Sequence, residues 1–406
     1  YHTASPYTVY CTDCDASDRW DPLSYGRAYD PGRPFFEQFD ELLRAVPKAG
    51  IFSSSDVGPN IRSEYTNFAG GNKDCYMVFN SGLNNENCSY SRGIMGSHDA
   101  FDVYLGDELE RCYEGVSVHR SAGVAWGQNV LDSIDSSFVR DGSGLQDCFG
   151  CVNLRHKSHH FLNEPLARGE YEKRVGDIRG SYSAMEKFRA QFEQFSLKLP
   201  RRENVNLKSV NVSGNYLFES KNCHDSFELS FCEDVRYSTF VKLAKDCQDI
   251  LGHGRKSELL LEGVAVGVAS RIIGGWWVQS SRDIAYSFGV RLSEQCFGCD
   301  SVRGAKFAIL NKQYPEDEYQ KHRTAIVGEL KAKGIYGLYF PPEIAPFAYN
   351  ETIGQDNVPL TKEEALAQGF RWQDDLQMTR DKETLKPGAI PDHIRDVKDS
   401  ITNDIL

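Results

Sequence analysis

Residues 148–171 read CFGCVNLRHKSHHFLNEPLARGEY, and residues 296–319 read CFGCDSVRGAKFAILNKQYPEDEY. Both stretches begin with Cys-Phe-Gly-Cys, share a Leu-Asn pair at the same place and end with Glu-Tyr, without a gap between the matches. The position numbers differ by 148, and Cys75 and Cys223 stand at the same separation. A common separation over such a long stretch indicates a tandem duplication.

A shorter period lies inside each copy. Small or β-favouring residues recur there at steps of twelve or thirteen residues and hold one phase. They are Cys75, Cys88, Ala100, Cys112, Val124, Ser136 and Cys148, then Cys223, Val235, Cys247, Leu259, Ile272, Ile284 and Cys296. A twelve-residue unit is too short for a helical repeat, and the alternation of apolar and polar residues over 227–231 indicates strands.

These patterns predict a mainly β chain that forms a duplicated parallel β-solenoid, with amphipathic helices capping its ends. We expect the recurring residues to point inward in stacked columns, which suits the cysteines because Cys is among the most buried residue types. We expect two of the units, each of about 12 residues, to form one coil of about 24 residues, with a three-unit coil as the alternative.

The position before the inward residue is usually acidic or an amide. Its occupants are Asp74, Asn87, Asp99, Asp135, Asp147, Asn222, Asp234, Asp246, Glu258 and Asp283. Short polar side chains of this kind tolerate left-handed backbone and hydrogen-bond nearby backbone groups. We interpret them as corner residues that accept backbone N–H bonds, because catalytic carboxylates should stand apart from a repeat while corner residues should follow it.

Apolar residues at helical spacing flank the repeats, and they divide the chain into six expected parts. These are an N-terminal segment with a partial zinc-ribbon knuckle and one helix (1–62), a first solenoid lobe (63–166), a linking amphipathic helix (167–200), a second solenoid lobe (201–314), a further helix (315–334) and an extended wrapping segment (335–406).

The amino-acid composition limits the kinds of partner and the cellular location that we expect. The 406 residues include 46 Lys and Arg against 58 Asp and Glu, a formal charge of −12, which argues against nucleic acid as the main partner because phosphate binding needs clustered basic residues. No run approaches the roughly 18 apolar residues of a membrane span. Twelve cysteines, most of them in the inward phase, favour reduced thiols and hence a cytoplasmic location.

Three Cys-x-x-Cys pairs are the candidate metal ligands, and zinc is the candidate cofactor. Such a pair supplies half of a tetrahedral zinc site. For Cys11 and Cys14 a zinc knuckle and an inert turn both stay open. Cys148, Cys151, Cys296 and Cys299 include residues of the inward phase, so structural burial is favoured over metal binding there. The histidines of the run 156–160 are expected to be surface residues, since alternate strand residues face opposite ways.

The pattern favours a non-enzymatic scaffold or binding protein, because a regular repeat supplies surface and no residue set reads as an active site. We expect a protein partner or self-association. The alternative is a carbohydrate-active β-helix enzyme, a polysaccharide lyase or hydrolase, that uses outward carboxylates beside Trp276 or Trp277. At least one of these rings should face outward and offer a contact surface.

Several segments together resemble a bacterial family of zinc-ribbon proteins with cysteine-rich repeats, known from uncultivated lineages. The resemblance covers nearly the whole chain and is carried by residues 6–11, 20–27, 63–70, both Cys-Phe-Gly-Cys segments, 340–343 and 349–352. It implies that Cys11 and Cys14 match the last two ligands of an N-terminal ribbon. The chain departs from the family pattern in lacking the first knuckle and a C-terminal ribbon, and its repeats hold fewer cysteines. The family implies no established activity.

Overall fold

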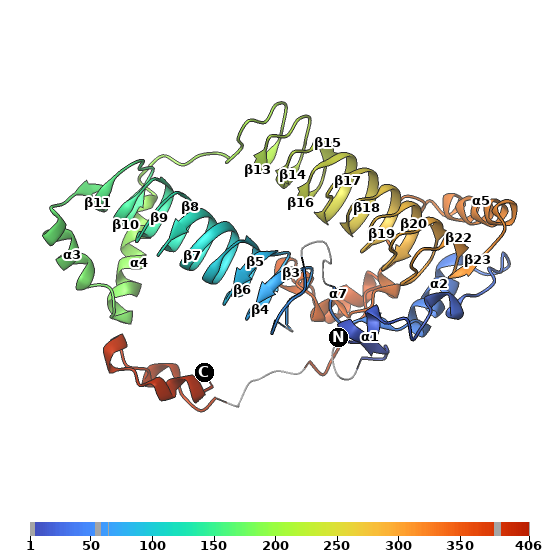
Figure 1. The fold of residues 1–406 in the computed structure, drawn as a ribbon, viewed down its shortest axis with the longest axis horizontal. Helices are drawn as coiled ribbons and strands as arrows, with labels where there is room; N and C mark the ends of the chain where they lie inside the picture. The colour runs from blue at the N-terminus through green and yellow to red at the C-terminus, as the bar shows by residue number, and fades with distance from the viewer. Residues whose placement is uncertain (1–4, 53–57, 64, 377–382, 406) are drawn as a thin grey trace. The chain divides into compact units, whose positions relative to one another are not determined.

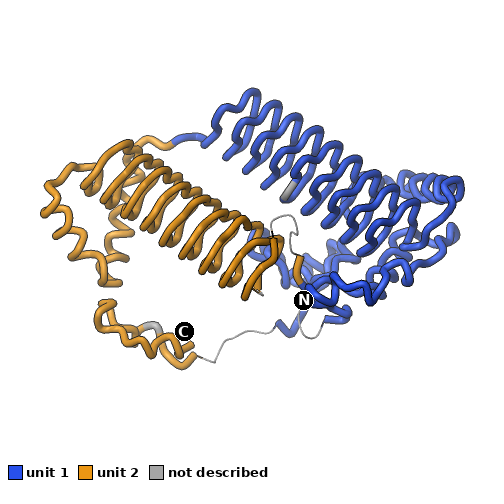
Figure 2. The backbone as a smooth tube through the Cα atoms, viewed as in Figure 1, with its two compact units in different colours: residues 1–50, 202–376 blue, residues 51–201, 377–406 orange. Residues whose placement is uncertain are grey.

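The structure is a computed structural model that describes residues 5–52, 58–63, 65–376 and 383–405. The chain forms two compact units, one of residues 1–50 with 202–376 and the other of residues 51–201 with 377–406. Each unit contains one stack of parallel coils (Figure 2). The predicted mainly β, duplicated β-solenoid is therefore confirmed. Within the described residues, no helix has the length and apolar character needed to cross a membrane.

Lobe 1, the solenoid of the second unit, is a parallel ladder that ends in an antiparallel pair (Figure 1). Two helices follow it, α3 (Arg168–Gly176) and α4 (Tyr182–Ser196). Its strands are β3 (Gly70–Lys73), β4 (Tyr76–Phe79), β5 (Gly82–Glu86), β6 (Ser89–Met95), β7 (His98–Ala122), β8 (Ala125–Leu131), β9 (Ser137–Ser143), β10 (Gln146–Val152), β11 (Ser158–Phe161) and β12 (Glu164–Pro165).

Lobe 2, the solenoid of the first unit, repeats this order and is followed by α5 (Glu316–Ala332). Its strands are β13 (Gly214–Phe218), β14 (Ser226–Ser230), β15 (Glu233–Arg236), β16 (Thr239–Lys242), β17 (Ala244–His253), β18 (Ser257–Val266), β19 (Ser270–Trp276), β20 (Arg282–Phe288), β21 (Glu294–Phe297), β22 (Lys306–Ile309) and β23 (Lys312–Gln313). The same unit holds β1 (Val9–Tyr10), α1 (Thr12–Ala16), α2 (Phe35–Ala45), β2 (Lys48–Ala49), α6 (Gly354–Asn357) and α7 (Lys362–Ala367).

One coil contains a single twelve-residue unit, so the expected two units per coil are wrong. Ser270 pairs with Arg282 and Arg282 with Glu294, which places successive strands twelve residues apart. The physical reason is the backbone: from Asp99 to Arg120 every third residue has a φ between 45° and 61°. Each such left-handed residue turns the chain, so a coil has four short sides rather than the long strands of a larger solenoid.

The inward cysteines lie as predicted. Cys75, Cys88, Cys112, Cys223 and Cys247 are buried and free, and they stack in the cores of the two lobes. The register differs from the prediction at one step. Leu259 is 49% exposed and occupies a corner with φ of 56°, whereas Leu260 is buried and pairs with Cys247. That coil therefore holds thirteen residues, and Glu258 stands one place before the corner.

Inward serines satisfy the polar backbone of the core. The Ser133 hydroxyl accepts a hydrogen bond from the Leu145 N–H, one coil later, at 3.1 Å and donates to the Leu131 carbonyl at 2.9 Å. Ser238 does the same in lobe 2, with the Ile250 N–H at 3.1 Å. A narrow coil points some N–H groups inward, and a buried N–H without a partner is costly. Inward serines thus supply hydrogen-bond acceptors for core N–H groups of this narrow coil.

The acidic corner residues adopt the left-handed backbone that was expected, with φ of 53° at Asp74 and 55° at Asp283. Two of their side chains have partners other than the expected backbone amides. Asp74 accepts from the Arg62 guanidinium and Asp283 from that of Arg271, in each case one coil earlier. The corner carboxylates therefore link successive coils through their outer surface.

An asparagine closes each solenoid. The Asn163 amide accepts from the Val152 N–H at 2.9 Å and donates to the Val152 carbonyl at 3.0 Å. Asn311 makes the same two bonds with Asp300, each at 2.8 Å. The side-chain amide thus takes the place of the next coil's backbone, which explains why the Leu-Asn pair is repeated.

Aromatic helix faces cover the last coils of each lobe. In lobe 1, the Phe188 ring of α4 lies with its centroid 4.6 Å from that of Phe149. In lobe 2, the Phe35 ring of α2 lies 5.1 Å from Phe297, the residue equivalent to Phe149. The outward aromatic residues of the final coils are therefore packed and not free surface.

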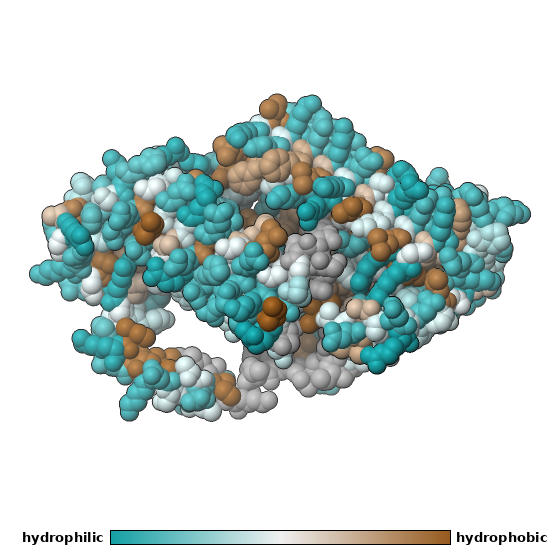
Figure 3. Space-filling view, viewed as in Figure 1, coloured by the Kyte–Doolittle hydropathy of each residue, from teal (hydrophilic) through white to brown (hydrophobic). Residues whose placement is uncertain are grey.

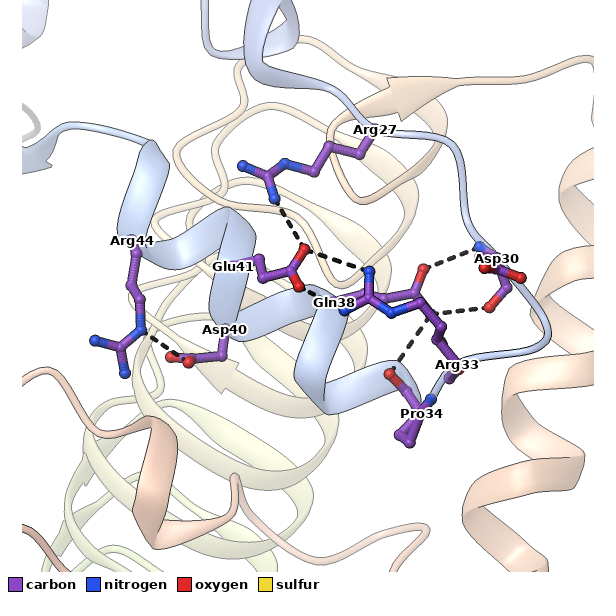
Figure 4. A network of polar contacts seen from close by, with 8 residues as sticks. All are labelled: Arg27, Asp30, Arg33, Pro34, Gln38, Asp40, Glu41 and Arg44. Atoms are coloured by element: carbon purple, nitrogen blue, oxygen red, sulfur yellow. Dashed lines mark hydrogen bonds and ion pairs between the residues drawn. The ribbon is translucent and has the colours of Figure 1, made fainter.

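A polar network holds α2 to the loop before it (Figure 4). The buried Gln38 amide accepts from the Asp30 N–H and donates to the Asp30 carbonyl, both at 2.9 Å. On the outer side, Glu41 forms ion pairs with Arg27 and Arg33. These polar contacts do not use the aromatic face of α2, which packs against the solenoid.

Replacing Ser133 by Ala should lower the free energy of unfolding by about 1–3 kcal/mol, because the buried Leu145 N–H loses its acceptor. Urea denaturation of the variant measures the loss. Ser143→Ala is the matched control, since Ser143 is on the outside of β9 and only half-buried. Equal effects of the two substitutions would contradict the role given to the inward serines.

Native-state alkylation should separate the thiols into two groups. Cys11 is exposed and Cys14 half-buried, whereas the other ten cysteines are buried. We expect iodoacetamide to label Cys11 first and Cys14 more slowly, and the ten core cysteines only after unfolding, as read by peptide mass spectrometry. Rapid labelling of Cys112 or Cys223 in the folded protein would refute the inward columns.

Candidate functional site

Cys11 and Cys14 lie together on the outside of the first unit. Cys11 immediately precedes α1, and Cys14 lies within it. The backbone amide and the thiol of Cys14 lower the pKa of Cys11, while the Cys11 thiol raises the pKa of Cys14. The helix is fixed to lobe 2 through Asp15, whose carboxylate lies 3.0 Å from Arg291 and from Arg303.

This thiol pair is half of a metal site. Zinc takes four ligands in structural sites, and its sulfur ligands are thiolates. No group of three or more His, Cys, Asp or Glu side chains that could hold a metal occurs among the residues described. The two thiols could bind zinc only with further ligands.

The two Cys-Phe-Gly-Cys segments lie inside the solenoids. Cys148, Cys151, Cys296 and Cys299 are all fully buried in the lobe cores. The Cys148 thiol donates to the carbonyl of Gln146 at 3.5 Å. The neighbouring thiol and burial raise the pKa of both Cys151 and Cys296. These cysteines lie where core packing places them, at adjacent inward positions of the last full coils.

The histidines of the 156–160 run do not converge. His156 is exposed, His159 lies 3.7 Å from the Asp147 carboxylate, and His160 bonds the Ser158 carbonyl through Nδ1 at 2.7 Å. They are surface or half-buried residues with separate partners.

Trp276 and Trp277 do not form the exposed platform that was expected. The Trp276 ring stacks on Phe288, with centroids 4.1 Å apart. Trp277 is only 7% exposed, and the Arg291 guanidinium lies 4.0 Å above its ring. Arg291 in turn pairs with Asp15 of α1, so the N-terminal segment occupies this side of lobe 2. The Asp15 carboxylate, which lies on the same side of lobe 2 as Trp277, is therefore engaged in an ion pair.

An open groove of about 660 Å³ follows five consecutive coils of lobe 2, from β17 to β21. Its lining includes inward small residues such as Ser257, Ala269 and Ser293. Leu243, Val268 and Leu292 form an apolar rim, and their exposed fractions are 38%, 38% and 71%. The space-filling view shows exposed apolar residues scattered among hydrophilic ones (Figure 3), so three of them along one groove are a local concentration.

The opposite rim of the groove carries alternating charges. Lys245 lies 3.5 Å from Glu233, and Arg282 lies 2.9 Å from Glu294. The hydrogen bond from Arg282 lowers the pKa of Glu294. The twelve-residue period did not predict this groove, although the apolar rim residues recur at steps of 24 or 25 residues, which is two coils.

Comparisons with known proteins do not assign the chain to a family. No family model matches it, and no curated protein matches it. A solved structure from Desulfovibrio desulfuricans G20, described as an acetyltransferase, is 10% identical, with a TM-score of 0.13 over 70% of this chain and 81% of the other. A likeness at that level carries no argument about activity.

Proposed function

We propose that the protein is a binding and assembly scaffold whose lobe 2 groove holds an extended segment of a partner polypeptide. The observation that supports the proposal is the groove itself, which follows five stacked coils and has one apolar rim and one charged rim. Along one rim, exposed apolar side chains alternate with Lys256 and Ser280, and such a mixture of apolar and polar groups is typical of interaction surfaces.

The charges of the groove favour a polypeptide over other extended partners. Lys245 and Arg282 alternate with Glu258 and Glu294 along one rim, so a uniformly anionic polymer would meet two carboxylates. The lining residues include no aromatic side chain, and sugars are commonly bound on aromatic platforms. A chain with alternating charges and apolar side chains matches both rims.

The carbohydrate-active alternative has less support. It rests on carboxylates beside Trp276 or Trp277, and these rings are packed against Phe288 and Arg291. A glycosidase needs two carboxyl groups about 5–10 Å apart on either side of an accessible bond. A screen for cleavage of plant and bacterial polysaccharides distinguishes the two hypotheses.

We also propose that Cys11 and Cys14 supply two of the four ligands of a structural zinc site, with the others outside the described residues. The accessible Cys-x-x-Cys pair on a helix that Asp15 fixes to lobe 2 supports this proposal. It agrees with the family resemblance of the N-terminal segment.

Replacing Leu292 by Glu should weaken peptide binding about tenfold or more, because it puts a charge into the most exposed apolar rim position. Peptides of twelve residues are selected from a random display library on the wild-type protein, and their Kd values are measured by fluorescence anisotropy. Leu251→Glu is the control, since Leu251 is 45% exposed on another side of lobe 2. Equal Kd values for the two variants would refute the groove.

Cobalt(II), a spectroscopic substitute for zinc, should bind this chain weakly, because two thiolates fill half of a tetrahedron. We expect the sulfur-to-cobalt absorption band only at a large excess of metal, and its loss in Cys11→Ser. Saturation at one equivalent would show that the chain itself completes the site.

A further inference from the structure

We propose that Ser117, His119 and Asp107 of lobe 1 form a catalytic triad that hydrolyses carboxylic esters. All three residues belong to β7, which spans two coils. Asp107 and His119 are twelve residues apart and therefore stack on successive coils. Ser117 stands two residues before His119, with the inward Val118 between them, so both flanking side chains point outward. This proposal goes beyond the scaffold function and concerns the other lobe.

The hydrogen bonds have the order that a triad requires. His119 Nδ1 is hydrogen-bonded to Asp107 Oδ1, and His119 Nε2 lies 3.2 Å from Ser117 Oγ. A carboxylate only accepts hydrogen bonds, so Nδ1 carries the proton. A ring that carries its one proton on Nδ1 presents the lone pair of Nε2, and the Ser117 hydroxyl can donate to it. The imidazole is thus held in the tautomer that can take the serine proton.

Burial fixes the nucleophile while the base stays accessible. Ser117 is 5% exposed, whereas the side chains of His119 and Asp107 are 28% and 39% exposed. Ser117 also stands at a left-handed corner inside β7, with φ of 54°, and the residues on either side of it, Val116 and Val118, pair with the next coil.

Ser117, His119 and Asp107 are not repeated at the equivalent positions of lobe 2. The positions 148 residues later hold Ala265, Gly267 and Arg255, none of which could play the same part. A residue kept for the corner or the coil should recur in both lobes, as Asn163 and Asn311 do. Other outward ladders, such as Arg120 with Asp132, are ion pairs without a nucleophile.

The reaction balances with water as the co-substrate. The Ser117 Oγ forms a bond to the ester carbonyl carbon as its proton passes to His119 Nε2. The intermediate collapses, the bond to the alcohol oxygen breaks, and the imidazolium gives its proton to the leaving alkoxide. Water then attacks the acyl-serine with the same base, which releases the carboxylic acid and restores the hydroxyl. Asp107 stabilises the imidazolium throughout.

Hydrolysis of 4-nitrophenyl acetate by the full chain tests the proposal. We expect Ser117→Ala and His119→Ala to lower kcat/KM about 100-fold or more, and Asp107→Asn to lower it about tenfold or more, since Asn favours the wrong tautomer. Ser117→Gly, which suits the left-handed corner, should lose the activity equally. Thermal melting shows whether each variant is folded.

Surface histidines also cleave activated esters, so His98→Ala is the control and should keep the wild-type rate; His98 is exposed at the start of β7. A fluorophosphonate probe gives a second readout. We expect one adduct, located on Ser117 by mass spectrometry and absent from His119→Ala. Unchanged hydrolysis in folded Ser117→Gly, or probe bound elsewhere only, would overturn the triad.

Discussion

Both lobes depend on hydrogen bonds between coils whose chain turns left-handed at every third residue. A left-handed residue with a side chain costs roughly 1–2 kcal/mol. The ladder offsets this cost, because a corner N–H such as that of Asp135 donates to the carbonyl thirteen residues earlier, at 2.9 Å. An outward N–H such as that of Tyr113 donates to the carbonyl eleven residues later, also at 2.9 Å. A coil is therefore stable only between two others, which is why each lobe ends on an asparagine that imitates the next coil.

The same constraint explains what the sequence could predict. Cys75 and Cys223 keep the inward phase because a coil of this size admits only small or medium side chains, so the duplication and the solenoid class were visible in the spacing. The coil length was not visible, since a twelve-residue unit gives the same period whether one or two units complete the turn. The signal for the shorter coil is a three-residue step of buried residues, as in Cys75, Val78 and Ser81. The predicted inward residue was wrong by one position at Leu259, because Leu260 follows it directly and either leucine fits a step of twelve or thirteen residues.

The candidate sites were hidden for the same reason. With two units per coil, residues twelve apart would lie on opposite walls, and Asp107 would be far from His119. With one unit per coil they stack, and their side chains meet. The corner residues Asp74 and Asp283 were assigned to local turns, whereas an arginine twelve residues earlier is within reach of each carboxylate. The coil length decides which residues stack on one another in this fold. Local secondary-structure propensity does not predict that length.

The duplication leaves each lobe free to change its outer surface while the inner columns stay fixed. The apolar rim residues Val268 and Leu292 correspond to Arg120 and Gly144 in lobe 1, so the apolar rim is not repeated at these positions. The triad positions are likewise occupied only in lobe 1. Outward residues carry little of the folding energy, because the ladder and the core hold the coil, and substitutions there change what the surface can bind or cleave. A site in such a protein is therefore best sought where equivalent outward columns of the two lobes differ in chemistry.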